Sequence, residues 1–398
     1  MTRDQPNSLL ISGNTGHNEK TPIHGYLYFF AGFLLSTILA IAAFGCSTII
    51  WRYIPETGKN ETCTSQPESP CQKRIVGYYS EWEYREISEE QLSKLTHIIF
   101  AFVNVNSTWH FSFESKGQET SFLRMKDKAK AAGVKVMISI SYDRSKHPSP
   151  LIPSVLEFIQ THDIDGVDFV FEWYKIPRIR MVIDAVFIKE LRSEFAKTAK
   201  YRGRKEPYLI SVMPPATYLY TEANLDALLG YVDFINVHSM NYEKHWKTDY
   251  GTFPGQLLTL RPGLQKESTD GELKYVACAS RSPSRINMPI NFYWFCWWNK
   301  TEGLLVPYNG KNTIGWDYSK IITYTGNTPV EYDGKTLYIL FENEESIREK
   351  MEYAKEKNIG GVVIWKIEFD DDQLTLLNVV ASKVPCIDNR NKINYDCY

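Results

Sequence analysis

The chain has 398 residues, of which 43% are hydrophobic and 14% aromatic, so it can bury one large core or two ordinary ones. Its net charge of -2 at pH 7 comes from interspersed acids and bases, which creates no long-range field that would attract nucleic acid. No basic run with interleaved aromatic residues is present, and we therefore expect no nucleic-acid partner.

Residues 1–24 are polar and show no hydrophobic period, which predicts a short disordered tail. Residues 25–51 contain no charged side chain and, as a helix rising about 1.5 Å per residue, would be about 40 Å long. That length spans a bilayer with some tilt. The apolar core of a cleaved signal peptide is usually only ~7–15 residues, so we interpret this segment as a permanent transmembrane signal anchor.

The positions of sequons and cysteines predict how this span is oriented. All three N-glycosylation sequons, which begin at Asn60, Asn106 and Asn299, follow the span, as do six of the seven cysteines. Both features are typical of an oxidising compartment. We therefore expect a single-pass type II membrane protein whose tail is cytoplasmic and whose C-terminal part is lumenal or extracellular. Residues 52–72, rich in proline, would form a stalk.

The six cysteines after the span admit many disulfide pairings, and the sequence alone does not choose among them. Their close spacings favour the local pairs Cys63–Cys71, Cys278–Cys296 and Cys386–Cys397. A zinc site is disfavoured because there is no C-x2-C pair and no cluster of histidines. The sequence predicts no metal and no cofactor.

From residue 73 to residue 384, strand-like and helix-like stretches alternate, which is the pattern of an α/β domain with parallel strands. The predicted strands are Arg74–Ser80, His97–Val105, Lys135–Ser141, Gly166–Glu172, Tyr208–Met213, Phe234–His238, Asn287–Phe292 and Gly361–Ile367. Helices are predicted between them, for example Phe122–Ala132, Pro150–His162 and Glu344–Lys357, the last with Asn343 as its N-cap. Residues 385–398 form a C-terminal tail with the last two cysteines.

The stretch from Asp163 to Tyr174 places acidic residues inside an apolar strand pattern. Side chains two apart on a strand share a face, so Asp168, Val170 and Glu172 point the same way. A single acid on a strand is usually a solvated edge residue. Two acids on the buried face of one strand instead indicate a functional site.

This stretch resembles the D-G-x-D-x-D-x-E signature of family 18 glycoside hydrolases, the chitinases and chitinase-like proteins. Asp165, Gly166, Asp168 and Glu172 match the signature, and Val170 stands in place of its third acid. The family's first, second and eighth strands are similar to Arg74–Tyr79, His97–Phe102 and Gly360–Trp365. The resemblance implies a (β/α)8 TIM barrel, whose sites lie at the carboxyl ends of the strands.

The resemblance also implies substrate-assisted hydrolysis of chitin, with Glu172 as general acid and Asp168 in support. In the family, the acid at the position of Val170 bonds the substrate's acetamide N–H, and valine offers no acceptor. A positioned acid–base group is typically worth ~10²–10⁴ in rate. We therefore expect Glu172 to be a vestigial acid in a barrel that has lost efficient chitinase activity.

Other parts of the family pattern are altered as well. The sixth-strand M-x-Y-D motif aligns without gaps so that Met240 and Asn241 replace its tyrosine and aspartate, although a two-residue slip would offer Tyr242. By position, Trp365 either floors the subsite of cleavage or simply fills the barrel. The residues predicted to contact sugar are Tyr78, Trp365, Met240, Asn241, Tyr242 and Trp297.

The aromatic run at residues 292–298 follows the seventh predicted strand. Its rings could stack on sugars, as in the family's clefts, or alternate members could pack inward as core. The family often carries a small α+β insertion after this strand, and residues 300–338 look too short for a full one.

Three functions remain open at this point. The first is a chitinase-like protein that binds chitin or other glycans containing N-acetylglucosamine without efficient hydrolysis. The second is a weak or altered glycosidase that uses Glu172. The third is a barrel kept as a protein-interaction scaffold.

Overall fold

The computed structural model describes most of the chain after residue 72. The described residues are 73–80, 85–106, 108–141, 149–170, 178–214, 222–238, 268–298, 302–307, 330–332, 335–340, 342–383 and 392–397. The predicted tail, span and stalk lie outside them. Within the described ranges, no helix is both long and apolar enough to cross a membrane.

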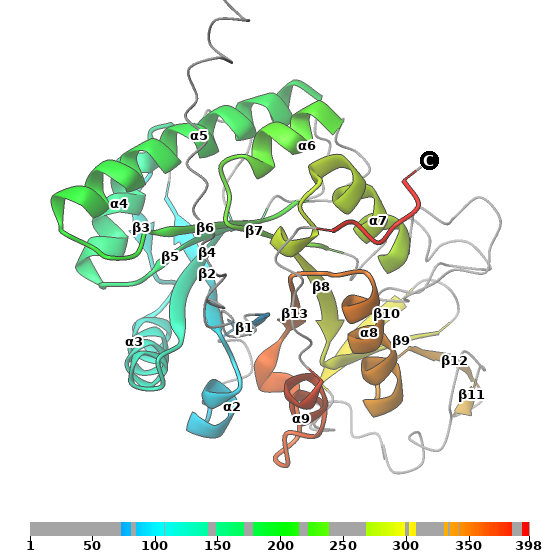
Figure 1. The fold of residues 1–398 in the computed structure, drawn as a ribbon. Coiled ribbons are helices and arrows are strands. Elements are labelled where there is room, and N and C mark those ends of the chain that lie inside the picture. Colours follow the sequence, from blue (N-terminus) through cyan, green and yellow to red (C-terminus); the bar gives the residue numbers. More distant parts are fainter. Residues whose placement is uncertain are drawn as a thin grey trace, which may run out of the picture. The chain divides into compact units, whose positions relative to one another are not determined.

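A closed barrel of parallel strands forms the centre of the described part (Figure 1). The main sheet has nine strands in the order β1-β13-β8-β7-β6-β5-β4-β2-β3, and pairing of β1 with β2 closes it. Short β3 (Phe111–Ser112) runs antiparallel to β2. The parallel strands are β1 (Arg74–Ser80), β2 (His97–Val105), β4 (Lys135–Ser141), β5 (Gly166–Val170), β6 (Leu209–Met213), β7 (Phe234–Asn236), β8 (Ile286–Asn291) and β13 (Gly361–Trp365).

All eight predicted barrel strands therefore form, and the TIM-barrel prediction is confirmed. Ten of the sixteen predicted bounds are exact and the other six move by one or two residues, because a strand ends where its neighbour stops pairing and not where its apolar pattern stops. Gly166 illustrates the close approach of neighbouring strands. A Cβ added there would collide with the backbone oxygen of Leu209 on β6, so the packing of β5 requires glycine at this position.

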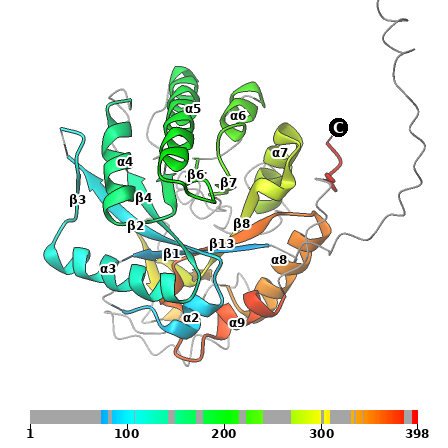
Figure 2. The ribbon, with the colours of Figure 1, turned by 60° about the vertical axis from the view of Figure 1, so that its left-hand side comes forward.

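Helices surround the barrel, and α4, α5, α6 and α7 lie side by side along one side of it (Figure 2). The helices are α2 (Glu89–Ser93), α3 (Lys116–Ala131), α4 (Leu151–Thr161), α5 (Arg178–Tyr201), α6 (Glu222–Leu229), α7 (Thr269–Ser280), α8 (Glu344–Glu356) and α9 (Thr375–Ser382), with short 3-10 turns η5 (Pro283–Arg285) and η7 (Ile367–Phe369). Asn343 caps α8 in a capping box with Ser346, as predicted. Helix α3 begins earlier than predicted, because Ser115 caps a polar first turn that carries no hydrophobic period.

Two apolar clusters form the core. The larger one lies between the sheet and the helices, and the smaller one fills the barrel interior. The interior cluster consists of Val76, Tyr78, Ile99, Ala101, Met137, Met213, Phe234 and Val363. The barrel is thus a packed core and not a pore, as its fold class requires.

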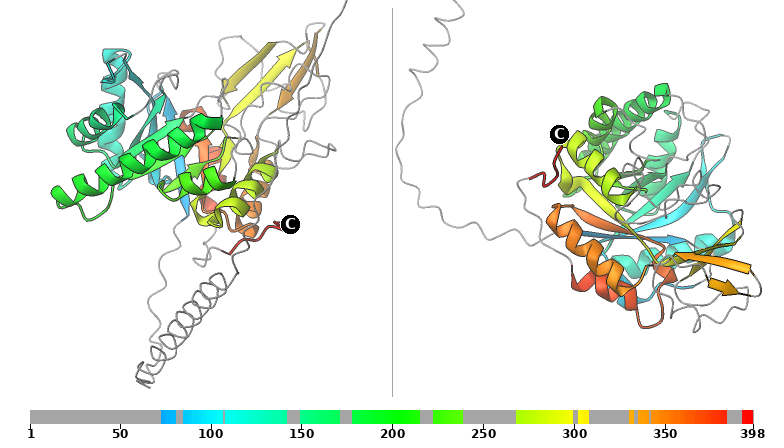
Figure 3. Two further views of the ribbon diagram at one scale, coloured as in Figure 1. Left: turned by 90° about the horizontal axis from the view of Figure 1, so that it is seen from above. Right: turned by 90° about the vertical axis from the view of Figure 1, so that its right-hand side faces the viewer.

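A second, antiparallel sheet follows β8 and stands beside the barrel (Figure 3). Its strands, in the order β10-β9-β12-β11, are β9 (Tyr293–Trp298), β10 (Glu302–Pro307), β11 (Val330–Tyr332) and β12 (Lys335–Leu340). Residues 300–338, which look too short for a full α+β insertion, contribute β10, β11 and part of β12 to this sheet. Aromatic residues favour strands, and β9 pairs on both edges, with β10 and with β12.

The disulfide in the described part joins Cys278 on α7 to Cys397, with Cα atoms 5.6 Å apart. The predicted local pairs Cys278–Cys296 and Cys386–Cys397 are therefore wrong. Cys296 lies on β9, in the second sheet. The C-terminal segment returns to the barrel instead, where Tyr395 OH lies 2.9 Å from Tyr353 OH on α8. Cys63, Cys71 and Cys386 lie outside the described residues.

Candidate functional site

Asp168, in the middle of β5, is fully buried inside the barrel. It lies in register with Ser139 on β4 and Ser211 on β6, so the three side chains meet in one layer of the interior. Tyr78 reaches this layer from β1, across the barrel, and Asn236 reaches it from β7. Four other strands, β1, β4, β6 and β7, therefore bring polar groups to one carboxylate on β5.

Both oxygens of Asp168 accept hydrogen bonds. Tyr78 OH donates to Oδ2 over 2.7 Å, and Ser139 Oγ donates to the same oxygen over 2.8 Å. Ser211 Oγ donates to Oδ1 over 2.6 Å, and Asn236 Nδ2 lies 3.5 Å from that oxygen. Burial still raises the pKa of Asp168 above its ordinary value, and these hydrogen bonds oppose that rise.

The polar network continues from Asn236 toward the amino ends of the strands. Asn236 Nδ2 donates to Tyr78 OH over 3.0 Å, and its Oδ1 accepts from Asn287 Nδ2 over 2.8 Å. Asn287 Oδ1 in turn accepts from Arg74 Nε over 2.9 Å. Each of these buried amides is thus paired on both sides, as buried polar groups require.

Val170 lies two residues beyond Asp168, on the same face of β5 and at its carboxyl end. It is partly buried and packs against the interior cluster, and Met213 on β6 is its partner in register. The acid layer is therefore followed, toward the mouth of the barrel, by apolar side chains on β5 and β6. Asp168 can hold its neighbours in place, but it is closed off from a ligand at the mouth.

Trp365 ends β13 at the same side of the barrel and is partly buried. Its ring lies 5.1 Å from the ring of Tyr78 and 6.1 Å from that of Phe102, measured between centroids. The peptide bonds Ala101–Phe102 and Trp365–Lys366 are both cis. Trp365 is thus an aromatic residue at the mouth that packs beside Tyr78, a hydrogen-bond donor to Asp168.

We define the mouth layer as five described residues at the carboxyl ends of the strands: Phe102, Val170, Met213, Asn291 and Trp365. Phe102, Val170 and Trp365 are partly buried against the interior cluster, to which Met213 belongs. Asn291 is the partner of Trp365 in the β8–β13 register. None of these side chains carries a charge.

His238 follows β7, next to this layer. Burial lowers its pKa to about 4, so the imidazole is neutral at physiological pH. Among the described residues, no three His, Cys, Asp or Glu side chains are grouped so that they could hold a metal ion.

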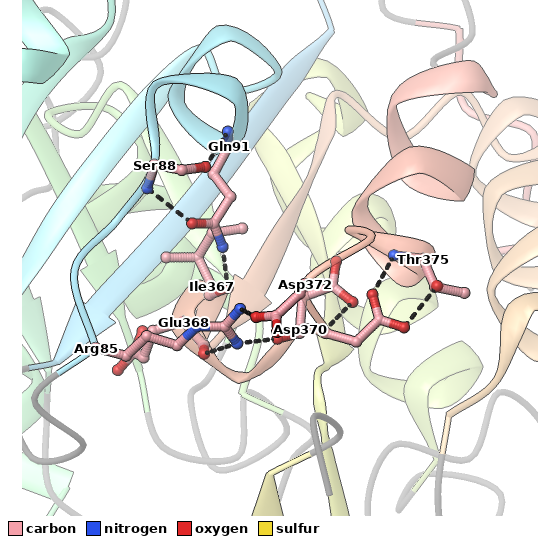
Figure 4. A network of polar contacts seen from close by, with 9 residues as sticks. Arg85, Ser88, Gln91, Ile367, Glu368, Asp370, Asp372 and Thr375 are labelled. Atoms are coloured by element: carbon pink, nitrogen blue, oxygen red, sulfur yellow. Dashed lines mark hydrogen bonds and ion pairs between the residues drawn. The ribbon is translucent and has the colours of Figure 1, made fainter. Parts of the chain in front are cut away.

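A second polar network, close to the end of β13, joins the segment before α2 to η7 (Figure 4). The guanidinium of Arg85 donates to the backbone oxygens of Glu368 and Asp370 and pairs with the carboxylate of Asp372 at 2.6 Å. Gln91 Nε2 donates to the backbone oxygen of Ile367 over 3.0 Å. These contacts fix the chain that follows Trp365.

Glu368 in this network is fully buried. Its Oε1 accepts from the backbone N–H and the hydroxyl of Ser80, at 2.9 and 2.5 Å. No described residue bonds its Oε2. Burial raises the pKa of Glu368 to about 7, so the carboxyl is largely protonated in mildly acidic solution.

The structure brings together three of the predicted site residues, because Tyr78 contacts both Asp168 and Trp365. Trp297 has its backbone in β9, and its side chain lies outside the described part. Asn106 is exposed in the turn after β2. The other predicted residues, Glu172, Met240, Asn241, Tyr242, Asn60 and Asn299, lie outside the described residues.

Sequence reasoning missed the other members of the Asp168 network. Ser211, Asn236 and Asn287 are polar residues at inward-facing positions of largely apolar strands. That alternation is visible in the sequence and could have indicated them. Which of them meet Asp168 depends on strand order, which the sequence pattern does not reveal.

The comparisons with known proteins agree with this fold. A family model described as "Glycosyl hydrolases family 18" matches residues 74–370. The endochitinase of Brugia malayi is 22% identical over 368 residues, which cover 77% of this chain and 72% of the endochitinase.

Two solved structures are similar over nearly their whole length. A family 18 chitinase from Cycas revoluta in complex with (GlcNAc)4 has 19% identity and a TM-score of 0.62, covering 78% of this chain and 99% of its own. YKL-39, solved in the presence of chitooligosaccharides, has 19% identity and a TM-score of 0.63 over the same shares. At this identity the likeness shows the fold.

Proposed function

The chain belongs to glycosyl hydrolase family 18, and from that premise we propose that its barrel binds oligosaccharides of N-acetylglucosamine without hydrolysing them efficiently. The observation that carries the proposal is the contrast along β5. Asp168 is buried and saturated with hydrogen bonds, whereas Val170, at the position of the signature's third acid, is an apolar member of the mouth layer.

The loss of catalysis follows from what Val170 lacks. A valine side chain accepts no hydrogen bond, so it cannot hold an acetamide N–H while the acetamide oxygen attacks the anomeric carbon. Asp168 cannot substitute for it, because both of its oxygens are occupied one layer deeper. Removing a group that acts in the transition state typically costs ~10²–10⁴ in rate. Glu172 would then remain as an acid without an organised substrate.

The retention of binding is supported by the mouth layer. Trp365 presents a partly buried aromatic ring at the carboxyl end of β13, where barrel sites lie. The solved structures of similar fold were obtained with (GlcNAc)4 or chitooligosaccharides, and ligands of this class are therefore the first to test.

Calorimetric titration of the full chain with (GlcNAc)4, in a detergent without a sugar headgroup, tests the proposal. We expect saturable binding that Trp365→Ala weakens at least tenfold and Trp365→Phe weakens less, because phenylalanine keeps an aromatic face. Tyr201→Ala is the matched control, since Tyr201 at the end of α5 is 92% exposed and distant from the mouth. Absence of binding by the wild type would refute the proposal and favour an interaction scaffold.

We further propose that residues 25–51 anchor the chain in a membrane as a type II protein, with the barrel lumenal or extracellular. Two features of the described part support this orientation. Cys278 and Cys397 form a disulfide, which is typical of oxidising compartments, and the sequon residue Asn106 is exposed. Protease protection in microsomes tests it: we expect the barrel to be protected until detergent is added, and digestion of the barrel in sealed vesicles would contradict the orientation.

A further inference from the structure

Asn291, the last residue of β8, carries a buried acceptor to which no described residue donates. The residue is only 4% exposed. No residue in the described part donates a hydrogen bond to its Oδ1. Buried side-chain oxygens are nearly always paired, so each exception calls for an explanation, such as a ligand.

The side chain of Asn291 faces the barrel interior. Strand residues alternate between faces, and Asn287, four positions earlier, bonds Asn236 and Arg74 inside the barrel. Ile290 and Phe292, on either side of Asn291, belong to the cluster between sheet and helices. Asn291 therefore points inward at the mouth.

Trp365 is the immediate neighbour of Asn291. The two residues are partners in register, and the backbone N–H of Phe292 donates to the backbone oxygen of Trp365 over 2.9 Å. An unused carbonyl oxygen thus lies next to a partly buried aromatic ring, at the end of the barrel where ligands bind in this fold class.

Comparison with Asn287 indicates that Asn291 does not stabilise the fold in the same way. Both are inward-facing asparagines on β8, but Asn287 has a partner for its amide N–H and another for its oxygen. Asn287 therefore stabilises the fold. An unpaired oxygen at Asn291 costs stability instead, because a leucine of similar shape would avoid the penalty.

The mouth layer indicates the chemistry of the missing donor. Its other members, Phe102, Val170, Met213 and Trp365, are apolar. A charged ligand would lose its hydration there without gaining a partner charge from these described side chains. A neutral saccharide offers O–H and N–H donors together with apolar C–H faces that can pack on an aromatic ring.

We propose that Asn291 Oδ1 accepts a hydrogen bond from an O–H or N–H group of a neutral saccharide bound at the mouth layer, and that Asn291 thereby helps to select the sugar unit beside Trp365. The inference rests on the proposed function and adds to it a specificity residue outside the D-G-x-D-x-D-x-E signature. Asn291 supplies at β8 an acceptor of the kind that Val170 lacks at β5.

Asn291→Leu separates a ligand-binding role from a structural one. We expect (GlcNAc)4 to bind the full-chain variant about tenfold or more weakly than the wild type, because the saccharide donor is left unpaired. The melting temperature should be equal or higher, because an unpaired buried oxygen has been removed. Asn287→Leu is the matched control, and its melting temperature should fall because Asn236 and Arg74 lose their partner.

A parallel titration with cellotetraose identifies the donor. A difference between wild type and Asn291→Leu for (GlcNAc)4 alone assigns the acetamide N–H, and a difference for both ligands assigns a hydroxyl. Unchanged affinity of Asn291→Leu for (GlcNAc)4, or a clear fall in its melting temperature, overturns the inference while the proposed function stands. If the wild type binds no saccharide, the proposed function fails and this inference fails with it.

Discussion

Asp168 and Val170 share one face of β5, yet Asp168 is fully buried and accepts hydrogen bonds on both oxygens, whereas Val170 packs among apolar side chains at the mouth. The two positions therefore have different physical roles. Asp168 fixes Tyr78, Ser139 and Ser211 in the interior. The side chain of Val170, at the mouth, can neither donate nor accept a hydrogen bond.

Replacing Asp168 should destabilise the barrel. Asp168→Ala leaves three buried hydroxyl donors without their acceptor, and we expect the free energy of unfolding to fall by about 3 kcal/mol. Val170→Ala is the control on the same face and should cost about 1 kcal/mol, because valine loses only two methyl groups at a partly buried position. Chemical denaturation measures both. An Asp168→Ala loss no larger than that of the control would contradict a structural role.

Glu368 should make stability depend on pH. Its pKa in the folded state is about 7, above the ordinary 4.5, so the folded state favours the protonated carboxyl. Its contribution to stability is therefore complete below pH 4.5 and is lost as the pH rises through 7. Glu368→Gln mimics the protonated form, and we expect it to be more stable than the wild type at pH 8 by up to about 3 kcal/mol.

Thermal denaturation at pH 4.5 and pH 8 checks this prediction for Glu368. At pH 4.5 the variant and the wild type should differ little, since both then carry a neutral side chain hydrogen-bonded to Ser80. Asp370, whose pKa burial raises to about 6, contributes in the same direction to both proteins and cancels in the comparison. A Glu368→Gln variant less stable than the wild type at pH 8 would show that the buried carboxylate is stabilising.

The disulfide between Cys278 and Cys397 should be found in the native protein. Peptide mapping without reduction is expected to recover the two cysteines in one cross-linked peptide pair. Changing both residues to serine should lower the free energy of unfolding by about 2–5 kcal/mol, because the bond closes a loop of 119 residues in the unfolded chain. Recovery of Cys278 linked to Cys296 would instead restore the pairing that sequence spacing suggests.

Asn106 should be glycosylated if the barrel is lumenal or extracellular. The residue is exposed, and its Oδ1 accepts from the backbone N–H and hydroxyl of Thr108, the third residue of the sequon. We expect Asn106→Gln to remove one glycan-dependent shift in gel mobility. Asn104→Gln, which changes an exposed asparagine outside any sequon, should leave the mobility unchanged. Equal mobility of the two variants would show that this sequon is not used.

Local features of the fold were predictable because they depend on local rules. Asn343 caps α8, and β1 and β2 have the predicted bounds. Capping residues and alternating apolar patterns can be recognised from residues that are close together in the sequence. Asp168 was identified for the same reason, as an acid on a buried strand face. The resemblance to family 18 implied that the site lies at the carboxyl ends of the strands.

Features that depend on the spatial arrangement of distant segments were not predictable. Ser211 and Asn236 meet Asp168 only because β5, β6 and β7 are consecutive in the barrel. Cys397 reaches α7 because the end of the chain returns past α8. The spacing of cysteines along the sequence does not show where the chain end packs. The strand β9 lies in a sheet because it pairs with β10 and β12, and the aromatic run alone did not reveal these partners.

The most direct test of binding without efficient hydrolysis is to follow product formation in samples of the full chain saturated with (GlcNAc)4. The wild type and Glu172→Gln are compared at equal occupancy, which calorimetry establishes. We expect saturation in both proteins and no turnover in the wild type above that of Glu172→Gln. Turnover in the wild type that disappears in Glu172→Gln would show that the barrel tolerates Val170 and works as a glycosidase.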